Sequence, residues 1–269
     1  MSARRLSDLT DLGGRVALVT GAAGHVGRVF VEALAELGAS VAVLDLDQRS
    51  CEEVSEAAAR EHGVQAFPLS VDLADEVQVR SAPGRVVERF GRLDIVVNCA
   101  AMVNTADLAG WIAPFEEQGV EAWRLAVETN LTAPFLLTQA CVGALRKSGH
   151  GSIVNVGSVY GLVGPDMRLY VGTQMGNAAA YAASKGGLLQ FTRWLATVLA
   201  PEIRVNAISP GGIWRDQPEA FCRRFRARTP LARLGTEEDL KGALAFLATD
   251  LSAYVTGQNI VVDGGFTAW

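Results

Sequence analysis

The sequence is poor in several kinds of residue, and each shortage excludes a class of protein. Its 269 residues include only three histidines and four cysteines, which are widely spaced at Cys51, Cys99, Cys141 and Cys222. Zinc sites and disulfide frameworks need closely patterned cysteines, so we expect no bound metal and reduced thiols. Basic residues number 24 against 29 acidic ones, and this slightly negative balance gives no general attraction to nucleic acid or anionic lipid.

Long apolar segments are also missing. No stretch of about 18 residues is free of charged or helix-breaking residues in the manner of a membrane span. The first residues, MSARRLSDLTDLGGR, contain two arginines but no apolar run behind them, whereas a secretory signal peptide needs one. We therefore expect a cytoplasmic protein without a membrane partner.

Short runs rich in valine and isoleucine alternate along the chain with longer stretches rich in alanine, leucine and glutamate. This alternation predicts βαβ units and an α/β fold of the Rossmann type, a doubly wound parallel sheet with helices on both faces. Strands are expected at residues 16–20, 40–45, 64–69, 93–98, 151–156, 204–208 and 259–262. Helices are expected near residues 26–37, 48–62, 75–90, 119–147, 178–200 and 237–248.

No repeat, linker or low-complexity block divides the chain, so we expect a single domain over residues 1–269. Three segments depart from the alternation, at residues 101–118, 159–177 and 209–235. Each follows the carboxyl end of a predicted strand, which is the edge where such sheets bind ligands. These loops are therefore candidate walls of a substrate site.

The first predicted strand runs into a glycine-rich turn, TGAAGHVG at residues 20–27, and a helix is expected to follow. In such units one glycine permits the tight turn, one lets backbone N–H groups approach a pyrophosphate, and one lets the helix pack on the strand. The helix N-terminus adds a positive dipole end. Gly21, Gly24 and Gly27 therefore predict a dinucleotide site with His25 over the phosphates, and a purely structural turn is the alternative.

The second predicted strand ends at Asp45, at about the spacing expected of an acidic residue that binds the adenosine ribose. A carboxylate accepts hydrogen bonds from the ribose hydroxyls and repels a 2′-phosphate. Asp45 therefore predicts NAD rather than NADP as cofactor. The alternative is a helix cap or turn residue, a role that Asp47 fills as well.

Tyr181 and Lys185 stand four residues apart at the start of a predicted helix and therefore share one face. A phenol with its usual pKa of about 10 is a poor base at neutral pH. A neighbouring ammonium, together with a positive nicotinamide ring, favours the phenolate and lowers that pKa. Ser158 follows the predicted strand at 151–156 and could hydrogen-bond the reacting oxygen.

Taken together, these motifs resemble the short-chain dehydrogenase/reductase family, in its short single-domain type. The resemblance rests on TGAAGHVG, Asp72, the NCAA segment at 98–101, Asn130, Ser158, Tyr181 with Lys185, Pro210-Gly211-Gly212 and the tail TGQNIVVDGG. These motifs occur in the family's order over nearly the whole chain. The resemblance implies a nicotinamide-dependent oxidoreductase with a small-molecule substrate.

The resemblance implies a role for each matching residue. Tyr181 would be the general acid/base, Lys185 would bind the nicotinamide ribose and lower the tyrosine pKa, and Ser158 would hold the substrate oxygen. Asn130 would anchor a water in the proton relay, or else be a structural residue at a helix kink. Asp72 would contact the adenine, unless it is a helix cap.

Further cofactor contacts are implied around the central strand and the PGG segment. Asn98 and its neighbours would stabilise the strand and line the ribose, and the backbone of residues 210–213 would face the carboxamide. The expected cofactor-binding set is Gly21, Gly24, His25, Val26, Gly27, Asp45, Asp72, Leu73, Asn98, Ala100, Tyr181, Lys185, Pro210, Gly211 and Ile213.

The chain departs from the family pattern at several positions. Short members usually have glycine where His25 stands, and the spacing here is that of the longer nucleotide-sugar epimerases. The chain is too short for the extra C-terminal domain of those enzymes. NCAA replaces the more usual NNAG. Arg215 stands where the family usually has a threonine. The hydrogen bond that the threonine would make to the nicotinamide carboxamide is therefore in question here.

The spacing between Ser158 and Tyr181 is longer than usual for the family. The insert, GLVGPDMRLYVGTQMGNAAA, is similar to inserts of members that act on sugars or surface-glycan precursors. It is expected to be either a wall of the substrate pocket or an ordered loop or subunit contact.

The substrate-pocket candidates combine aromatic side chains with few charges. They are Met102, Val103 and Trp111 on the first loop, Tyr160, Met167 and Tyr170 on the second, and Trp214, Arg215 and Phe221 on the third. Such a wall favours a ring-shaped polyol, sugar or other secondary alcohol. Four arginines at positions 223, 224, 226 and 228 would suit an anionic substrate, or else form a solvated helix face.

The sequence thus predicts an NAD-dependent oxidoreductase that interconverts a secondary alcohol and its ketone, with Tyr181 as general acid/base. One alternative is a nucleotide-sugar epimerase or dehydratase with tightly bound NAD, and another is a cofactor-binding sensor without catalysis. The predicted helices at 119–147 and 178–200 are apolar over more than one face, so we expect a homo-oligomer, a tetramer or else a dimer. Trp269 is a candidate for that interface or for a neighbouring active site.

Overall fold

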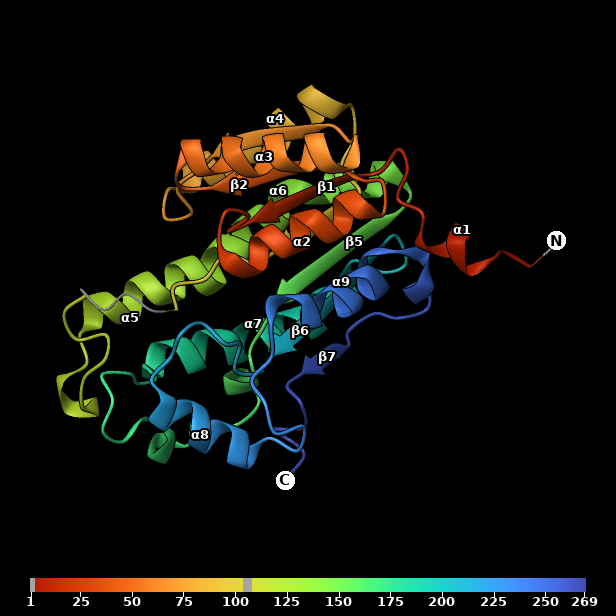
Figure 1. The fold of residues 1–269 in the computed structure, drawn as a ribbon. Coiled ribbons are helices and arrows are strands. Elements are labelled where there is room, and N and C mark those ends of the chain that lie inside the picture. Colours follow the sequence, from red (N-terminus) through yellow and green to blue (C-terminus); the bar gives the residue numbers. More distant parts are fainter. Residues whose placement is uncertain (1–2, 104–107) are drawn as a thin grey trace.

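A seven-stranded parallel sheet forms the centre of the molecule (Figure 1). The computed structural model describes residues 3–103 and 108–269. The strands are β1 (Val16–Thr20), β2 (Ser40–Asp45), β3 (Ala66–Ser70), β4 (Ile95–Asn98), β5 (Gly151–Val156), β6 (Ile203–Pro210) and β7 (Asn259–Val262). Their spatial order is β3-β2-β1-β4-β5-β6-β7. The chain changes direction across the sheet between β1 and β4, and a doubly wound sheet binds its ligand at such a switch point.

The sheet confirms the predicted Rossmann-type fold, with small changes at the strand ends. Strand β3 begins two residues later than predicted, β4 begins at Ile95, and β6 extends to Pro210. Alternate residues of β1 face opposite sides, so that Ala17 and Val19 join one core while Val16 and Leu18 join the other. Both faces are buried, which is why the strands are almost wholly apolar.

Helices cover the two faces of the sheet in two layers. On the face nearer the viewer in Figure 1 lie α2 (His25–Glu36), α3 (Gln48–His62) and α9 (Lys241–Ala248). On the other face lie α4 (Glu76–Phe90), α6 (Ala133–Ser148) and α7 (Ala179–Val198). A short helix, α1 (Leu6–Thr10), precedes β1 and was not predicted from the sequence.

The helix predicted at 119–147 is interrupted. It consists of α5 (Val120–Val127), a π-helical turn over Glu128–Thr132, and α6. Pro134 follows this turn, and it has no N–H to donate to the α-helical ladder. Wide turns of this kind are rare and often occur at functional sites.

The three irregular segments lie at the carboxyl edge of the sheet, as predicted, and each contains short helices. The first contains Phe115–Glu117, and the second contains Val159–Gly161 and Met167–Tyr170. The third contains α8 (Glu219–Arg228), below the sheet in Figure 1. Of the helices in the described ranges, none combines the length and apolar character needed to cross a bilayer.

Candidate active site

Two neighbouring cavities open at the carboxyl edge of the sheet. The larger, of about 600 Å³, is lined by the glycine-rich turn, Asp45 and Asp72. The smaller, of about 300 Å³, is lined by Ser158 and Tyr181. Both are lined by Val26, Cys99, Ala101, Val103 and Arg215. The two cavities are therefore parts of one crevice, which lies over the switch point of the sheet.

The glycine-rich turn can adopt its shape only without side chains at two positions. Gly21 has a φ of 63°, and a Cβ there would lie 2.6 Å from the Cα of Ala100. A Cβ on Gly27 would lie 2.0 Å from the carbonyl oxygen of Gly21. Helix α2 therefore starts directly on the turn, and its first residues, His25 and Val26, line the larger cavity. This cradle and helix N-terminus fit the pyrophosphate of a dinucleotide.

Asp45 and Asp72 both line the larger cavity, and neither caps a helix. The caps of α3 and α4 are Asp47 and Asp75. The Asp45 carboxylate accepts hydrogen bonds from the backbone N–H groups of Ala23, at 2.9 Å, and Leu46, at 2.8 Å. These bonds hold an acidic group beside the glycine-rich turn. Each carboxylate oxygen keeps a further lone pair that can accept from a ligand.

Asn98 lines neither cavity, unlike its neighbours. Its Nδ2 donates to Oδ1 of Asn155 at 2.8 Å, and Nδ2 of Asn155 donates to Oγ1 of Thr192 at 2.9 Å. This buried chain of side chains joins β4, β5 and α7. Cys99, Ala100 and Ala101, the residues that follow it, line the larger cavity.

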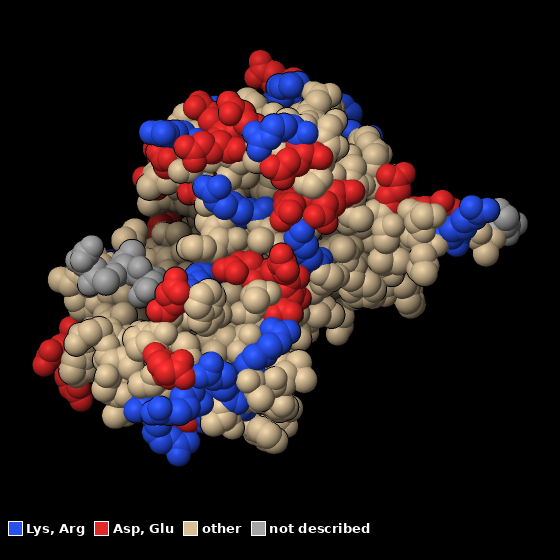
Figure 2. Space-filling view, in the orientation of Figure 1, with Lys and Arg blue, Asp and Glu red and all other residues tan. Residues whose placement is uncertain are grey.

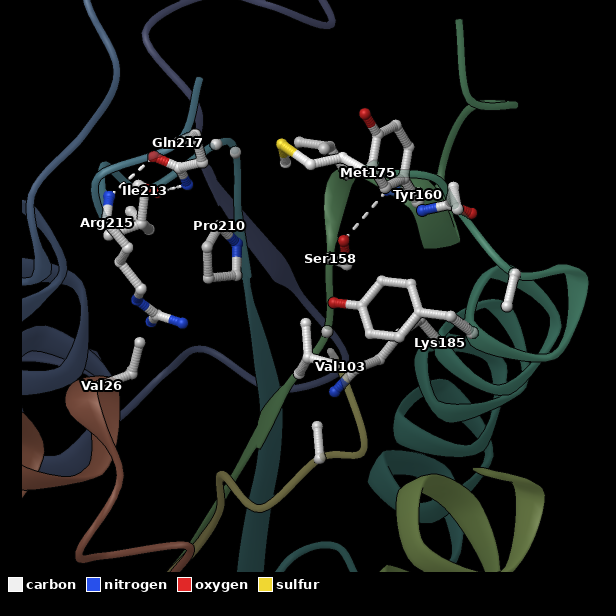
Figure 3. Close-up of a pocket in the computed structure, with 18 of the residues that line it drawn as sticks. Val26, Val103, Ser158, Tyr160, Met175, Lys185, Pro210, Ile213, Arg215 and Gln217 are labelled. Atoms are coloured by element: carbon white, nitrogen blue, oxygen red, sulfur yellow. Dashed lines mark hydrogen bonds between the residues drawn. The ribbon is translucent and has the colours of Figure 1, made fainter. Parts of the chain in front are cut away.

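Tyr181 and Lys185 lie on the first half of α7, next to Ser158. The Lys185 Nζ donates to the carbonyl oxygen of Val156 at 2.6 Å and lies 5.9 Å from the centroid of the Tyr181 ring. Gly161 allows this arrangement, because a Cβ there would come within 2.8 Å of the Lys185 carbonyl carbon. Figure 3 shows the side chains of Ser158, just after β5, and of Lys185, on α7, entering the same space.

Burial controls the proton affinities of this pair. It raises the pKa of Tyr181 above its usual value, while a hydrogen bond with Ser158 and the charge of Arg215 act to lower it. Burial also lowers the pKa of Lys185 to about 8. The sequence predicted that the ammonium would lower the tyrosine pKa. In the protein alone burial raises the pKa of Tyr181 instead, and the ammonium of Lys185 is bonded to the Val156 carbonyl oxygen.

Asn130 is fully buried in the π-helical turn and lines neither cavity. Its Oδ1 accepts from the Met102 N–H at 2.7 Å, and its Nδ2 donates to Oγ of Ser184 at 3.1 Å. The Ser184 hydroxyl donates in turn to the carbonyl oxygen of Tyr181 at 2.9 Å. Asn130 thus ties the loop after β4 to the turn of α7 that carries Tyr181, which agrees with the structural alternative for this residue.

The insert after β5 contributes residues to the lining of the smaller cavity, as expected of a pocket wall. Tyr160, Tyr170 and Phe221 line this cavity, as predicted. The hydroxyls of Tyr160 and Tyr170 are 2.8 Å apart, and the Tyr170 ring stacks on Phe221 with centroids 5.5 Å apart. The cavity is also lined by residues that no sequence motif indicated individually: Met175, Gly176, Asn177, Gln217 and Phe225. Their positions depend on how the insert and α8 pack together, for which no motif exists.

Four substrate candidates lie elsewhere. Met102 lines the larger cavity, and Trp111 is buried against α5 and the start of α7. Met167 and Trp214 are each 53% exposed and line neither cavity. Ile213 faces the smaller cavity and pairs with Gly235, so the next side chain, Trp214, points the other way.

The arginines of α8 fasten the insert. Arg224 donates to the carbonyl oxygens of Leu169 and Val171, and Arg228 pairs with Asp166. Arg226 pairs with Glu219 within α8. Figure 2 shows basic side chains gathered over the part of the molecule where Figure 1 places α8. Most of this charge is therefore engaged in structural contacts, which favours the helix-face alternative over an anionic substrate.

Comparison with known proteins gives consistent matches over almost the full length. A sequence model of the family described as Enoyl-(Acyl carrier protein) reductase matches residues 21–267. The chain is 36% identical over 259 residues to cis-4-hydroxycyclohexanecarboxylate dehydrogenase of Sinomonas cyclohexanicum, which covers 94% of this chain and 97% of that protein. It is 34% identical over 257 residues to the 3-oxoacyl-acyl-carrier-protein reductase FabG of Escherichia coli strain K12, with the same two coverages.

Solved structures of related proteins are also similar to this chain in fold. A short-chain type dehydrogenase/reductase from Mycobacterium marinum superposes with a TM-score of 0.85 at 32% identity, covering 99% of this chain and 100% of that one. NAD⁺-bound xylitol dehydrogenase gives 0.84 at 30% identity, with coverages of 94% and 99%. A gluconate 5-dehydrogenase from Burkholderia cenocepacia in complex with NADP and tartrate gives 0.87 at 29% identity, with coverages of 98% and 100%.

Proposed function

The chain belongs to the short-chain dehydrogenase/reductase family of nicotinamide-dependent oxidoreductases, and on that premise we propose that it is an NAD-dependent dehydrogenase of a ring-shaped secondary alcohol. The observation that carries this proposal is the position of Tyr181 and Ser158. Both line a smaller, mainly apolar cavity that adjoins the larger cavity fitted to a dinucleotide. A carbinol in the smaller cavity would stand beside the phenol and the end of the cofactor.

The preference for NAD rests on Asp45. Its carboxylate lines the larger cavity at the end of β2 and is held there by two backbone N–H groups. It would accept hydrogen bonds from the adenosine ribose and repel a 2′-phosphate. Related structures contain either NAD⁺ or NADP, so this choice depends on the residues of each chain rather than on the family.

The side chains of the site divide the reaction among them. In the oxidative direction, Ser158 holds the substrate oxygen and the Tyr181 phenolate takes the hydroxyl proton. The nicotinamide, when bound, supplies the acceptor for the hydride that leaves the carbinol carbon. Loss of the proton and the hydride converts the alcohol to its ketone. Lys185 would hold the nicotinamide ribose, and Asn130 keeps Tyr181 in place through Ser184.

The smaller cavity favours a ring without positive charge that carries a second polar group. Within the described part of the chain, its lining residues include no aspartate or glutamate. Phe221, Phe225 and Met175 supply apolar contacts, while Tyr160 and Tyr170 supply hydroxyls at the end away from the sheet. Its volume of about 300 Å³ suits a small ligand. The hydroxycyclohexanecarboxylate substrates in the names of two relatives contain such a ring alcohol.

The two alternative functions have less support. Relatives that match over more than nine-tenths of their own length include dehydrogenases and a reductase. A sensor without catalysis would not need Ser158, Tyr181 and Lys185 brought together in one crevice.

We also propose that the chain assembles as a homotetramer. Trp123 on α5, Phe135 on α6 and Trp194 on α7 are each at least 40% exposed. The ring of Phe191 lies between those of Phe135 and Trp194, with centroid distances of 5.9 Å and 6.3 Å. A row of aromatic rings on adjoining helices is a large apolar patch, of the kind that a partner subunit covers.

A substrate panel tests the proposed function. Purified protein is mixed with cyclic alcohols, including the hydroxycyclohexanecarboxylates, and with polyols, sugars and hydroxy acids, each with NAD or NADP. We expect formation of reduced nicotinamide with a cyclic secondary alcohol, and faster with NAD. Conversion of a sugar nucleotide without net reduction of NAD would indicate the epimerase alternative instead.

A further inference from the structure

One cationic side chain stands where the two cavities meet. Arg215 lines both of them, at the position where the family usually has threonine. Its charge reaches the reactive part of the crevice, since it acts to lower the pKa values of both Cys99 and Tyr181. The residue is therefore placed to meet a ligand that spans the two cavities.

The backbone around Arg215 is held in place. Ile213 pairs with Gly235, and the Trp214 N–H donates to the Gly235 carbonyl oxygen at 2.8 Å. The Arg215 N–H donates to Oε1 of Gln217 at 2.7 Å, and Nε2 of Gln217 donates back to the Ile213 carbonyl oxygen at 2.8 Å. These hydrogen bonds fix the position of the Arg215 Cα, from which the side chain extends.

The guanidinium group is only partly engaged by protein. Its Nε donates to Oε1 of Glu237 at 3.1 Å, and its side chain is 37% exposed. Among the described residues, the terminal nitrogens Nη1 and Nη2 have no hydrogen-bond acceptor. Figure 3 shows the guanidinium end reaching into the crevice between Pro210 and Val26. Since Val26 belongs to the first turn of α2, the group faces the amide-rich end of that helix.

The charge balance of the larger cavity shows what Arg215 would contribute. Asp45 and Asp72 also line this cavity, and Arg215 is its one lysine or arginine in the described ranges. A dinucleotide pyrophosphate carries two negative charges, whereas a helix N-terminus supplies only about half a positive charge. A guanidinium binds phosphate oxygens with two parallel hydrogen bonds.

We propose that Arg215 binds the pyrophosphate of the cofactor from the side opposite the N-terminus of α2, an inference that rests on the proposed nicotinamide function. The pyrophosphate is then held between the helix amides and the guanidinium, and Nη1 and Nη2 gain acceptors. A carboxylate on the substrate offers the same anionic chemistry from the smaller cavity. The experiment below separates these two sources.

The test compares ligands with and without the pyrophosphate. Arg215→Gln removes the charge, and Glu237→Gln, the matched control, removes only its ion-pair partner. Affinities for NADH, ADP-ribose and adenosine are measured by fluorescence and competition, with thermal melting as a check on folding. We expect R215Q to bind NADH and ADP-ribose about 10- to 100-fold more weakly, as for a lost hydrogen bond to a charged group, with adenosine unchanged. E237Q should bind ADP-ribose at least as tightly as the unaltered protein.

Three results would overturn the inference. Equal ADP-ribose affinity in R215Q and the unaltered protein excludes the pyrophosphate contact, and a KM that then rises only for carboxylate-bearing alcohols assigns Arg215 to the substrate. An equal loss in E237Q and R215Q assigns the effect to the loop. Failure of the unaltered protein to bind either NADH or ADP-ribose contradicts the proposed function as well as this contact.

Discussion

Ser158 and Arg215 both oppose the effect of burial on the phenol of Tyr181. Burial favours the neutral phenol, whereas a hydrogen bond with the serine and the positive charge of the arginine favour the phenolate. Together with Tyr160, which also raises the pKa of Tyr181, these influences set the pH at which Tyr181 can accept a proton. Lys185 contributes by position, since it is buried and bonded to the Val156 carbonyl oxygen.

This balance predicts how Ser158→Ala changes the pH dependence of oxidation. Oxidation needs the deprotonated phenol, so kcat/KM rises with pH through the pKa of Tyr181. Loss of the Ser158 hydrogen bond raises that pKa, so the rising limb should move to higher pH. The rate at neutral pH should fall by about 10²- to 10³-fold, as for a lost oxyanion donor. Initial rates of NADH formation across pH measure both effects.

The control is Ser81→Ala, on the exposed face of α4, which should leave the pH profile unchanged. An S158A profile that superimposes on that of the unaltered protein would refute the role of Ser158.

Asp45→Asn should weaken the preference for NAD. The amide keeps the shape of the side chain but removes the charge that repels a 2′-phosphate. We expect the ratio of kcat/KM for NAD to that for NADP to fall by about 10- to 100-fold, since like charges in contact cost several kcal/mol. Asp47→Asn is the matched control, because Asp47 caps α3 and does not line the cavity. An unchanged ratio in D45N would exclude Asp45 as the selecting residue.

At the residue scale, the sequence predicted the site residues whose type is required by the chemistry of binding and proton transfer. The glycine-rich turn, Asp45, Ser158, Tyr181 and Lys185 were all found from motifs, and all line the crevice. The motifs did not predict the direction of the tyrosine pKa, because burial depends on the packing of the whole site. Nor did they predict that Trp214 faces solvent, since this follows from the pairing of Ile213 with a distant glycine.

At the scale of elements, the close contact between α2 and β1 is the most demanding. Gly27→Ala should lower the free energy of unfolding by about 1–3 kcal/mol, the usual cost of overpacking, because its Cβ would overlap the Gly21 carbonyl oxygen. It should also weaken NADH binding by displacing the first turn of α2. Denaturant unfolding and NADH fluorescence measure these two effects.

Gly84→Ala provides the comparison for that experiment. Gly84 lies within α4, and a Cβ there meets nothing within 4 Å. Removing a glycine from a helix interior should stabilise the protein by roughly 0.5–1 kcal/mol. If both variants stabilise the protein, the tight approach of α2 to β1 is not required.

Elements were predictable where a periodic pattern exists and not where packing decides. Strands β1, β2, β5 and β7 have the predicted bounds, since each is an apolar run between turns. The π-helical turn before Pro134 gives no periodic signal of its own. The insert adopts its shape through Arg224 and Arg228 of α8, which are more than 50 residues away in sequence. Contacts at such separation leave no local pattern.

At the scale of the whole molecule, the aromatic row on α6 and α7 predicts a self-associating protein. Trp194→Glu places a charge in that row and should convert the assembly to smaller species, as measured by size-exclusion chromatography with light scattering. Leu6→Glu on α1 is the control, because Leu6 is 73% exposed and lies on a different element from the row. A monomeric unaltered protein, or a W194E variant of unchanged mass, would contradict the proposed tetramer.

The most direct test of the account is Tyr181→Phe, which removes one oxygen from the crevice. Tyr160→Phe is the matched control, since its phenol lies in the same cavity but at the substrate end. We expect Y181F to lose about 10²- to 10⁴-fold in NAD-linked alcohol oxidation, as for a lost general base, while its affinity for NADH stays within a few fold. Y160F should lose far less. If Y181F oxidises the alcohol at the rate of the unaltered protein, the assignment of this phenol as the proton acceptor is wrong.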